Sequence, residues 1–219
     1  MNIVLLVLDL LFPRRCAGCS RRGTAWCPTC HAGTAGLVAV HRTLLAGTRA
    51  YAATAYTGPA RRLVVAYKER RRRELARPIG LILADAVPRV LAREGLGSRC
   101  WLVPAPSRPA ALRKRGGNHV TLAAAHTARS LRTRGLSVEV APVLHLRRGT
   151  RDSVGLTPEA RLSNLRHRVR VRGPLPPPDT PVLFIDDVIT TGATAATCVS
   201  ALRAAGAQVA ATLTLTATV

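Results

Sequence analysis

A pair of adjacent acids and a threonine-rich run lie close together near the C-terminus of the chain. The acids, Asp186 and Asp187, follow the apolar residues 182–185, which predict a short buried strand of a parallel sheet. The run after them comprises Thr190, Thr191, Gly192, Ala193 and Thr194. Apolar residues then recur at helical spacing up to Gly206, so the segment predicts a strand, a turn and a helix.

These residue types suit a phosphorylated sugar. Unpaired N–H groups and a partial positive charge at the start of the predicted helix favour a phosphate, and Gly192 lets the backbone come close to it. Two carboxylates would repel a phosphate, so their expected partners are sugar hydroxyls and a divalent cation. A Walker A loop is excluded because the Gly-Lys-Ser/Thr ending is missing. The alternative is an ordinary strand-to-helix turn in which the acids and threonines serve as caps.

Four cysteines near the N-terminus form a second constellation. Cys16 and Cys19 make one Cys-x-x-Cys pair, and Cys27 and Cys30 make another after a short gap. Four thiolates at this spacing predict a closed tetrahedral zinc site, which would be structural because no position is left for a reacting water. The alternative is a pair of disulfides, which the lack of a secretory signal disfavours.

Length and composition predict a globular protein with one good core and a small appendage. The chain has 219 residues, of which 47% are hydrophobic. We expect an N-terminal part over residues 1–45, with an amphipathic helix and the zinc segment, and a second part over residues 46–219. Residues 1–11 are apolar, but they lack a basic start and are too short to span a bilayer, so we expect the helix to pack on the body; the alternative is a membrane-surface anchor. We therefore expect a cytoplasmic protein with no stable membrane insertion.

The charge balance makes nucleic acid a candidate partner. The chain has 33 basic and 11 acidic residues, a formal net charge of +22, which predicts salt-sensitive attraction to polyanions. The alternative is a compositional bias toward arginine and alanine, since Lys68 and Lys114 are the only lysines. Aromatic residues make up only 3%, which leaves few platforms for stacking bases.

Two groups of arginines are predicted to lie near the acid pair. A strand over residues 100–103 ends in a proline-rich turn, and the carboxyl ends of parallel strands flank one crevice. The cations after this strand that could hold a pyrophosphate are Arg108, Arg113 and Arg115; their alternative role is a solvated basic helix end. Residues 147–156 form a long polar loop that carries Arg148 and Arg151 and predicts a lid.

The remaining pattern predicts the elements around this crevice. Strands are expected over residues 50–56 and 139–146, and helices over residues 78–94, from about residue 113 to residue 131, and over residues 158–166. Residues 208–219 alternate apolar side chains with others, which predicts a half-buried strand.

Taken together, these motifs resemble the ComF/GntX family. The resemblance rests on the four-Cys knuckle, Val103-Pro104-x-Pro106, Arg113-x-Arg115-Gly116-x-Asn118, Arg148-x-Thr150 with Arg161-x-x-Asn164, and the acid and threonine motif. That last motif also resembles the phosphoribosyl pyrophosphate motif of type I phosphoribosyltransferases. The implied fold is a type I phosphoribosyltransferase-like parallel sheet flanked by helices, preceded by a small zinc-binding segment.

The resemblance also implies an activity. A phosphoribosyltransferase, which is a glycosyltransferase for pentosyl groups, would bind 5-phosphoribosyl 1-pyrophosphate with Mg²⁺ and transfer ribosyl phosphate to an unknown acceptor. Asp186 and Asp187 would hold the ribose 2- and 3-hydroxyls, and residues 190–194 would wrap the 5-phosphate. Arg108, Arg113 and Arg115 are candidates for the leaving pyrophosphate, and Arg148 and Arg151 for closing over it.

A second function from a different class stays open. Several family members are associated with natural competence, the uptake of external DNA, so single-stranded DNA and competence proteins are candidate partners. The alternative is a non-catalytic nucleic-acid-binding competence factor that uses the ribose-phosphate pocket to recognise a nucleotide or a strand end. The charge of +22 supports it, whereas the acid pair and the low aromatic content oppose it. His119 and His145 are nearby candidates for a general base, although each is more often structural.

Overall fold

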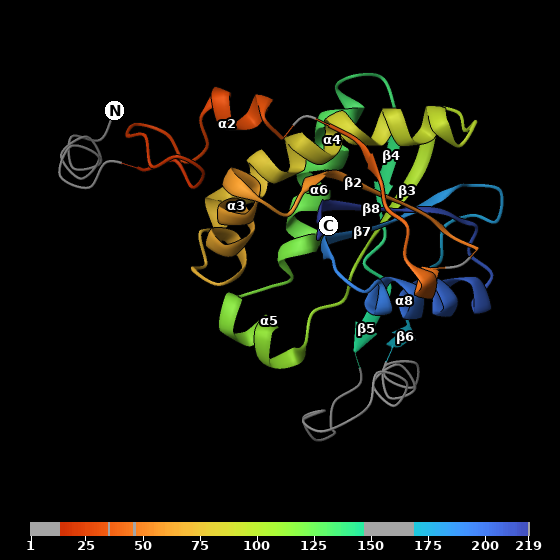
Figure 1. Cartoon of the computed structure of the whole chain (residues 1–219). Coiled ribbons are helices and arrows are strands. Elements are labelled where there is room, and N and C mark those ends of the chain that lie inside the picture. The colour runs from red at the N-terminus through yellow and green to blue at the C-terminus, as the bar shows by residue number, and fades with distance from the viewer. Residues whose placement is uncertain (1–13, 35, 46, 147–168, 219) are drawn as a thin grey trace.

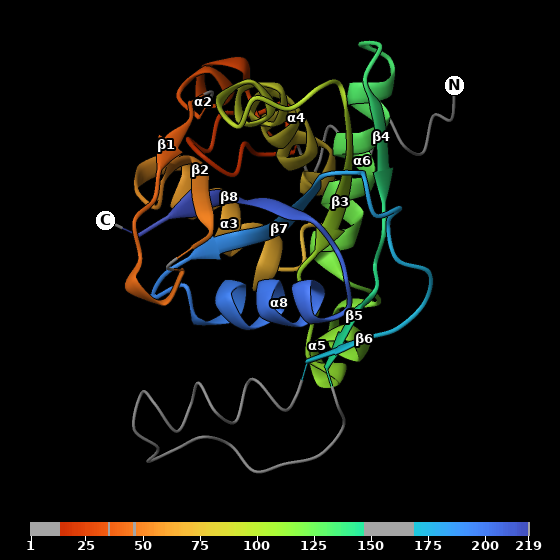
Figure 2. The same cartoon turned by 90° about the vertical axis from the view of Figure 1, so that its right-hand side faces the viewer.

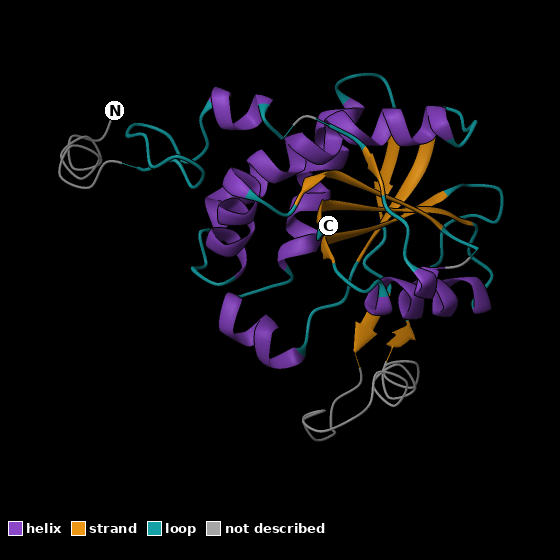
Figure 3. Cartoon of the chain, viewed as in Figure 1, coloured by secondary structure: helices purple, strands orange, loops and turns teal. Residues whose placement is uncertain are grey.

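The structure is a computed structural model that describes residues 14–34, 36–45, 47–146 and 169–218. In this part of the chain a mostly parallel central sheet is flanked by helices, so the fold class is α/β (Figure 1, Figure 3). The predicted helices over residues 1–11 and 158–166 lie outside the described residues, and so does the lid that carries Arg148 and Arg151.

Within these ranges the helices are α2 (Pro28–Ala32), α3 (Gly58–Lys68), α4 (Ala76–Arg93), α5 (Pro109–Arg115), α6 (His119–Arg132) and α8 (Ala193–Ala204), with short turns of 3-10 helix at η1 (Thr43–Leu45) and η2 (Arg73–Leu75). The main sheet contains β1 (Val38–Ala39), β2 (Arg49–Ala55), β3 (Arg99–Pro104), β4 (Ser137–Val140), β7 (Val182–Ile189) and β8 (Val209–Ala217). β5 (Leu144–Leu146) and β6 (Val169–Val171) pair antiparallel in a separate sheet. The predicted strands over residues 50–56 and 100–103 and the predicted helix over residues 78–94 are confirmed.

The main sheet has the strand order β1-β2-β8-β7-β3-β4, which runs from left to right in Figure 2. β1 pairs antiparallel with β2, and the other strand pairs in this sheet are parallel. The carboxyl ends of β2, β8, β7, β3 and β4 therefore lie at one edge, where the loops that follow them can meet.

Helices cover both faces of this sheet. α3, α4 and α6 lie on one face, where Leu83 and Leu131 are buried in one apolar cluster. α8 lies on the other face, where Phe184 and Leu202 belong to a second cluster. Residues 182–185 are buried and divide between the two clusters, so the predicted burial of this strand on both faces is confirmed. Among the described residues, no helix is long and apolar enough to cross a membrane.

β7 is longer than the apolar run predicts, because both acids lie inside the strand rather than after its end. Residues up to Ile189 pair with β8, and Asp186 lies opposite Thr214. On the other side, β3 ends at Pro104, opposite Ile185. The acids therefore lie beyond the end of β3 and have a neighbouring strand on one side only.

β8 is buried on both faces, so the prediction of a half-buried strand is wrong. The alternation of apolar residues with threonine suggests one polar face, yet this face is also buried, including Thr212, Thr214 and Thr216. The Thr214 hydroxyl donates to the carbonyl oxygen of Tyr51 at 3.3 Å, and the Thr216 hydroxyl donates to that of Asp187 at 3.2 Å. Main-chain acceptors thus allow the Thr214 and Thr216 hydroxyls to lie in the interior, whereas the buried Thr212 hydroxyl has no hydrogen-bond partner among the described residues.

The predicted strand over residues 139–146 is divided into β4 and β5. Ala141, Pro142 and Val143 lie between them, and proline has no N–H to contribute to a strand ladder. β4 pairs with β3 in the main sheet, whereas β5 pairs with β6. A continuous β-type pattern therefore supplies strands to two different sheets.

Candidate functional site

The acid pair lies where the chain changes sides of the sheet. β3 and β7 are neighbours, but α6 follows β3 on one face and α8 follows β7 on the other. In open parallel sheets, such a switch point opens a crevice beyond the carboxyl ends of the strands. The N–H of Ala105 donates to the carbonyl oxygen of Ile185 at 2.8 Å. The turn after β3 and the acid pair are therefore neighbours, as predicted.

Asp187 is held by side chains from two helices. Lys68 Nζ, at the end of α3, lies 3.0 Å from Asp187 Oδ2, and His119 Nε2, at the start of α6, lies 2.8 Å from the same oxygen. Only 11% of the Asp187 side chain and 10% of the His119 side chain are exposed. The Tyr67 hydroxyl donates to the carbonyl oxygen of His119 at 2.7 Å, and its ring packs edge-on against the imidazole. The carboxylate is thus fixed from two directions.

The two acids differ in charge state at neutral pH. Burial alone would raise the pKa of Asp187, but the hydrogen bond from His119 and the charge of Lys68 outweigh it and lower this pKa to about 2. Burial and the negative charge of Asp187 raise the pKa of Asp186 to about 8. An oxygen of Asp186 also accepts the N–H of Asp187 at 2.8 Å. Neighbouring carboxyl groups whose pKa values move apart are typical of functional sites.

We expect Asp186→Asn to stabilise the unliganded protein in alkaline solution. The pKa of Asp186 is raised from its unfolded value near 3.9. The contribution of the neutral acid to the stability of the folded protein is therefore fully present below about pH 4 and is lost as the pH rises through about 8. Asparagine keeps an acceptor for the Asp187 N–H and carries no charge. The free energy of unfolding, measured in urea, should rise by at least ~1 kcal/mol at about pH 9 and change little at about pH 4. Equal gains at both pH values, or a similar gain in the exposed control Asp179→Asn, would contradict the assignment.

The threonine-rich segment forms the turn into α8, as predicted. Thr190, Thr191 and Thr194 are exposed, Gly192 is buried, and Ala193 is the first residue of the helix. Gly192 is left-handed, with φ 81°, and a Cβ at this position would lie 3.2 Å from the side chain of Leu45. The backbone therefore favours glycine, and a side chain at this position would also need Leu45 to move by a few tenths of an ångström. Exposed hydroxyls and the first N–H groups of a helix lie together here, an arrangement that suits an anion.

Arg42, just before η1, anchors this turn. Its Nε donates to the carbonyl oxygen of Thr190 at 2.5 Å, and its Nη2 donates to the carbonyl oxygen of Thr218. The same segment packs against Gly192 through Leu45. The turn is thus held from outside by main-chain contacts, which leave the threonine hydroxyls exposed. No local pattern connects Arg42 with Thr190, because 148 positions separate them.

The arginines predicted to hold a pyrophosphate lie around α5. Arg108 is the exposed N-cap of this helix, Arg113 is exposed on it, and Arg115 is its last residue. The single helix predicted from about residue 113 is divided into α5 and α6, because Gly116 takes a left-handed conformation and Asn118 caps α6. Asn118 Nδ2 also donates to the carbonyl oxygen of Ala105 at 2.8 Å, which ties this junction to the end of β3. In the described part of the chain, no hydrogen bond or ion pair joins Arg108 or Arg113 to the acid pair.

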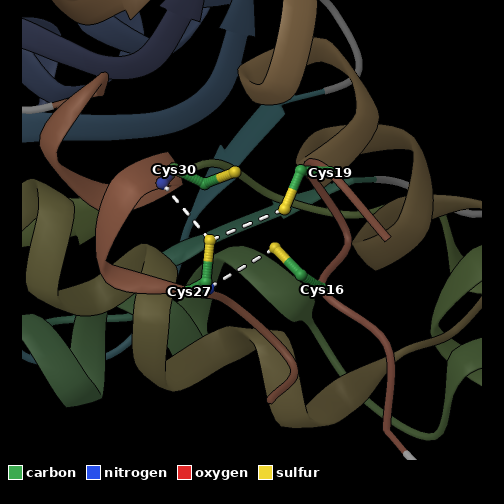
Figure 4. Close-up of side chains that lie close together, drawn as sticks. All are labelled: Cys16, Cys19, Cys27 and Cys30. Atoms are coloured by element: carbon green, nitrogen blue, oxygen red, sulfur yellow. Dashed lines mark hydrogen bonds between the residues drawn. The ribbon is translucent and has the colours of Figure 1, made fainter. Parts of the chain in front are cut away.

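The four cysteines converge, as predicted (Figure 4). Their Sγ atoms all lie within 4.8 Å of one another, and those of Cys19 and Cys27 are 3.6 Å apart, too far for a disulfide bond. Burial raises the pKa of Cys16, but the backbone N–H groups of Cys19, Cys27 and Gly18 outweigh it and lower this pKa to about 6. By contrast, burial and the neighbouring sulfurs raise the pKa of Cys30. Four sulfurs so close can all be thiolates only with a cation among them, so the cluster could bind a metal ion.

The four-Cys segment is attached to the first half of α3. Arg62 Nε donates to the carbonyl oxygen of Gly18 at 2.5 Å, and a Cβ at Gly18 would lie 3.1 Å from the Pro59 side chain. The last residue of the same helix is Lys68, which pairs with Asp187. α3 therefore connects the cysteine cluster physically with the acid pair.

No family model matches the sequence, and a comparison with curated proteins finds no match. The functional conclusion therefore depends on the geometry of the site. Three side chains at this site were not among the predicted site residues: Arg42, Tyr67 and Lys68. Of these, only Lys68 has a signal in the sequence, because it is one of just two lysines in an arginine-rich chain. An ammonium at the end of a flexible stem can reach a largely buried carboxylate without filling the space that a guanidinium needs.

Proposed function

We propose that this protein is a type I phosphoribosyltransferase-like enzyme of the ComF/GntX family, which binds 5-phosphoribosyl 1-pyrophosphate with Mg²⁺ and transfers ribosyl phosphate to an acceptor. One observation carries the proposal: an acid pair with separated pKa values lies in a strand that leads directly into exposed threonine hydroxyls at a helix N-terminus. A sugar phosphate offers a phosphate to the helix and hydroxyls to the acids. The switch-point position of the pair supports the same conclusion.

In this proposal, residues 190–194 bind the 5-phosphate. The threonine hydroxyls and the first N–H groups of α8 donate hydrogen bonds to its oxygens, and Gly192 lets the backbone approach them. Arg42 is a positioning residue, because it contacts the turn through the carbonyl oxygen of Thr190 and leaves the hydroxyls to the ligand.

The acids accept hydrogen bonds from the ribose hydroxyls. Lys68 and His119 keep Asp187 ionised and oriented for this role. Because His119 Nε2 is bonded to Asp187, the contact supports an orienting role for His119 rather than that of a general base. When the bond from the anomeric carbon to the pyrophosphate oxygen breaks, positive charge develops on the ribosyl ring, and a nearby carboxylate stabilises it.

The leaving pyrophosphate needs cations. The acid pair would hold Mg²⁺ that comes with the substrate, and the ion would supply positive charge for the leaving group. The remaining negative charge of the pyrophosphate would be bound by arginines of the chain. The candidates are Arg108, Arg113 and Arg115 around α5, with Arg148 and Arg151 from outside the described residues.

For the four-Cys cluster we propose a structural Zn²⁺. Four sulfur donors satisfy its preferred tetrahedral coordination and leave no position for a reacting water. The low pKa of Cys16 favours a thiolate at neutral pH, which is the form that binds the metal. The metal would hold the segment that contacts α3 in one conformation.

The proposal is tested by calorimetric titration of phosphoribosyl pyrophosphate with Mg²⁺ into the wild type and Asp186→Asn. We expect saturable binding that is at least ~10-fold weaker in the variant, because Asp186 can lose its proton when the Mg²⁺-bound ligand arrives and accept with both oxygens, whereas asparagine cannot. Since the same substitution should leave the unliganded protein at least as stable as the wild type, misfolding could not explain weaker binding.

Asp179→Asn is the matched control, because it removes an exposed acid and should bind like the wild type. Equal affinity in the wild type and Asp186→Asn would refute the role of the acid pair. If the wild type itself shows no saturable binding, the proposed activity is wrong, and the nucleic-acid-binding alternative becomes the better explanation of the net charge of +22.

A further inference from the structure

A second pocket lies beside the acid pair, between the segment after α3 and the junction of α5 with α6. Its lining residues are Tyr67, Arg71, Arg73, Gly117, Asn118, His119 and Leu122. Tyr67 and His119 also line the small cavity that contains Asp187. The pocket and the acid pair therefore share a wall, so a group bound in the pocket would lie next to a ligand held by the acids.

Several polar groups in the wall are engaged within the protein. The Tyr67 hydroxyl donates to the carbonyl oxygen of His119, and His119 Nε2 is bonded to Asp187. The Asn118 side chain caps α6 with its oxygen and donates its Nδ2 to Ala105. Recognition by this pocket therefore depends mainly on its two arginines.

Arg71 and Arg73 are both exposed, and among the described residues no acid forms an ion pair with either. Arg72, which lies between them, is instead paired with Glu74 at 2.8 Å. Two guanidinium groups at one pocket repel each other unless an anion lies between them, and each offers a planar fork of donors that matches phosphate oxygens. The chemistry of the pocket thus selects for an anion.

Arg71 is held in a strained backbone conformation, and a glycine leaves room for Arg73. Arg71 has φ 54°, a left-handed conformation that costs about 1 kcal/mol or more for a residue with a side chain. Arg73 Nη1 lies 3.1 Å from the place that a Cβ on Gly116 would take. A glycine at 116 therefore leaves room for the guanidinium, and Gly117 adds no side chain to fill the pocket.

We propose that this pocket is an anion subsite in which Arg71 and Arg73 bind a phosphate or pyrophosphate group. The inference deepens the proposed function and rests on it, because the anion would belong either to the pyrophosphate of the donor or to a phosphate on the acceptor. In both cases the subsite places the charged group beside His119 and Asp187, next to the ribose that the acids hold.

The test uses inorganic pyrophosphate as the probe, titrated calorimetrically into the wild type and the double variant Arg71→Gln/Arg73→Gln. The matched control is Arg77→Gln/Arg129→Gln, which removes two exposed arginines that do not line the pocket. We expect the affinity to fall at least ~10-fold in the first variant and less than ~2-fold in the control. Equal losses in the two double variants would overturn the proposal, because general charge would then explain them.

Two further titrations separate the sources of the anion. If the donor's pyrophosphate binds here, the double variant loses affinity for phosphoribosyl pyrophosphate and keeps its affinity for ribose 5-phosphate. If the acceptor's phosphate binds here, the double variant keeps its affinity for phosphoribosyl pyrophosphate. In addition, inorganic pyrophosphate still binds to wild-type protein that is saturated with phosphoribosyl pyrophosphate. Both results support the subsite. Failure of the proposed function would appear separately, as unchanged affinity of Asp186→Asn for ribose 5-phosphate.

Discussion

Replacement of Asp187 by alanine is expected to abolish saturable binding of phosphoribosyl pyrophosphate and to destabilise the protein. The variant removes the partner of Lys68 at 3.0 Å and of His119 at 2.8 Å. Breaking a buried ion pair costs ~3–5 kcal/mol, but water reaches Lys68, so we expect a loss of ~2 kcal/mol in the free energy of unfolding at pH 7. Urea denaturation measures this loss, and calorimetry measures the binding.

The stability difference between wild type and Asp187→Ala should depend on pH. The folded-state pKa of Asp187 is lowered to about 2, so the stability it contributes is present above its unfolded value near 3.9 and is lost as the pH falls through about 2. The two proteins should therefore become equally stable in strong acid. A difference that stays constant down to about pH 2 would show that Asp187 contributes by packing rather than by charge.

Asp187→Ala also separates the two candidate functions. Affinity for single-stranded DNA should stay unchanged or rise slightly, because the substitution removes a negative charge from a strongly basic protein. Asp179→Ala, which removes an exposed acid, is the control for the change in net charge and should keep both stability and sugar-phosphate binding. If Asp187→Ala bound phosphoribosyl pyrophosphate like the wild type, the assignment of the site would be wrong.

The second large effect is expected from the cysteine cluster. The purified protein should contain one zinc ion per chain, and Cys16→Ser/Cys27→Ser should contain none, because two of the four thiolates are missing. Without the metal, the segment that contacts Pro59 and Arg62 on α3 loses its fixed conformation. We expect the melting temperature to fall by ~5 °C or more, which corresponds to ~2 kcal/mol for a chain of this size.

The control for this experiment is Cys100→Ala, which changes a buried cysteine outside the cluster. Its small cavity should lower the melting temperature without changing the zinc content, so metal loss and core damage can be told apart. Metal analysis of the wild type is decisive: a folded protein without metal would refute a structural zinc site.

The strongest predictions from the sequence concern groups that are close together in the chain. The buried strand with its two acids, the turn into α8 and the convergence of the cysteines all follow from residues within about 15 positions of each other, where backbone geometry limits the possible arrangements. The turn after β3 lies beside the acids. Predicting this needed only the rule that the carboxyl ends of parallel strands share one edge of the sheet.

The sequence pattern was misleading where tertiary neighbours decide the structure. β7 continues through both acids because β8 is long enough to pair with them, which no property of residues 182–189 reveals. The threonines of β8 predicted a polar face, but this face is buried, and main-chain acceptors in neighbouring strands pair the hydroxyls of Thr214 and Thr216.

The sequence by itself therefore determined the chemical types present: a pair of acids, a turn rich in threonine and glycine, and a four-sulfur cluster. Only the tertiary structure decided the pKa values of the acids and the contacts that hold these groups in place. Lys68 and His119 reach Asp187 from 119 and 68 positions away, and Arg42 reaches the threonine turn from 148 positions away. The reason is physical: charge state, burial and orientation depend on what packs around a group in space, and this packing is set by helices on both faces of the sheet.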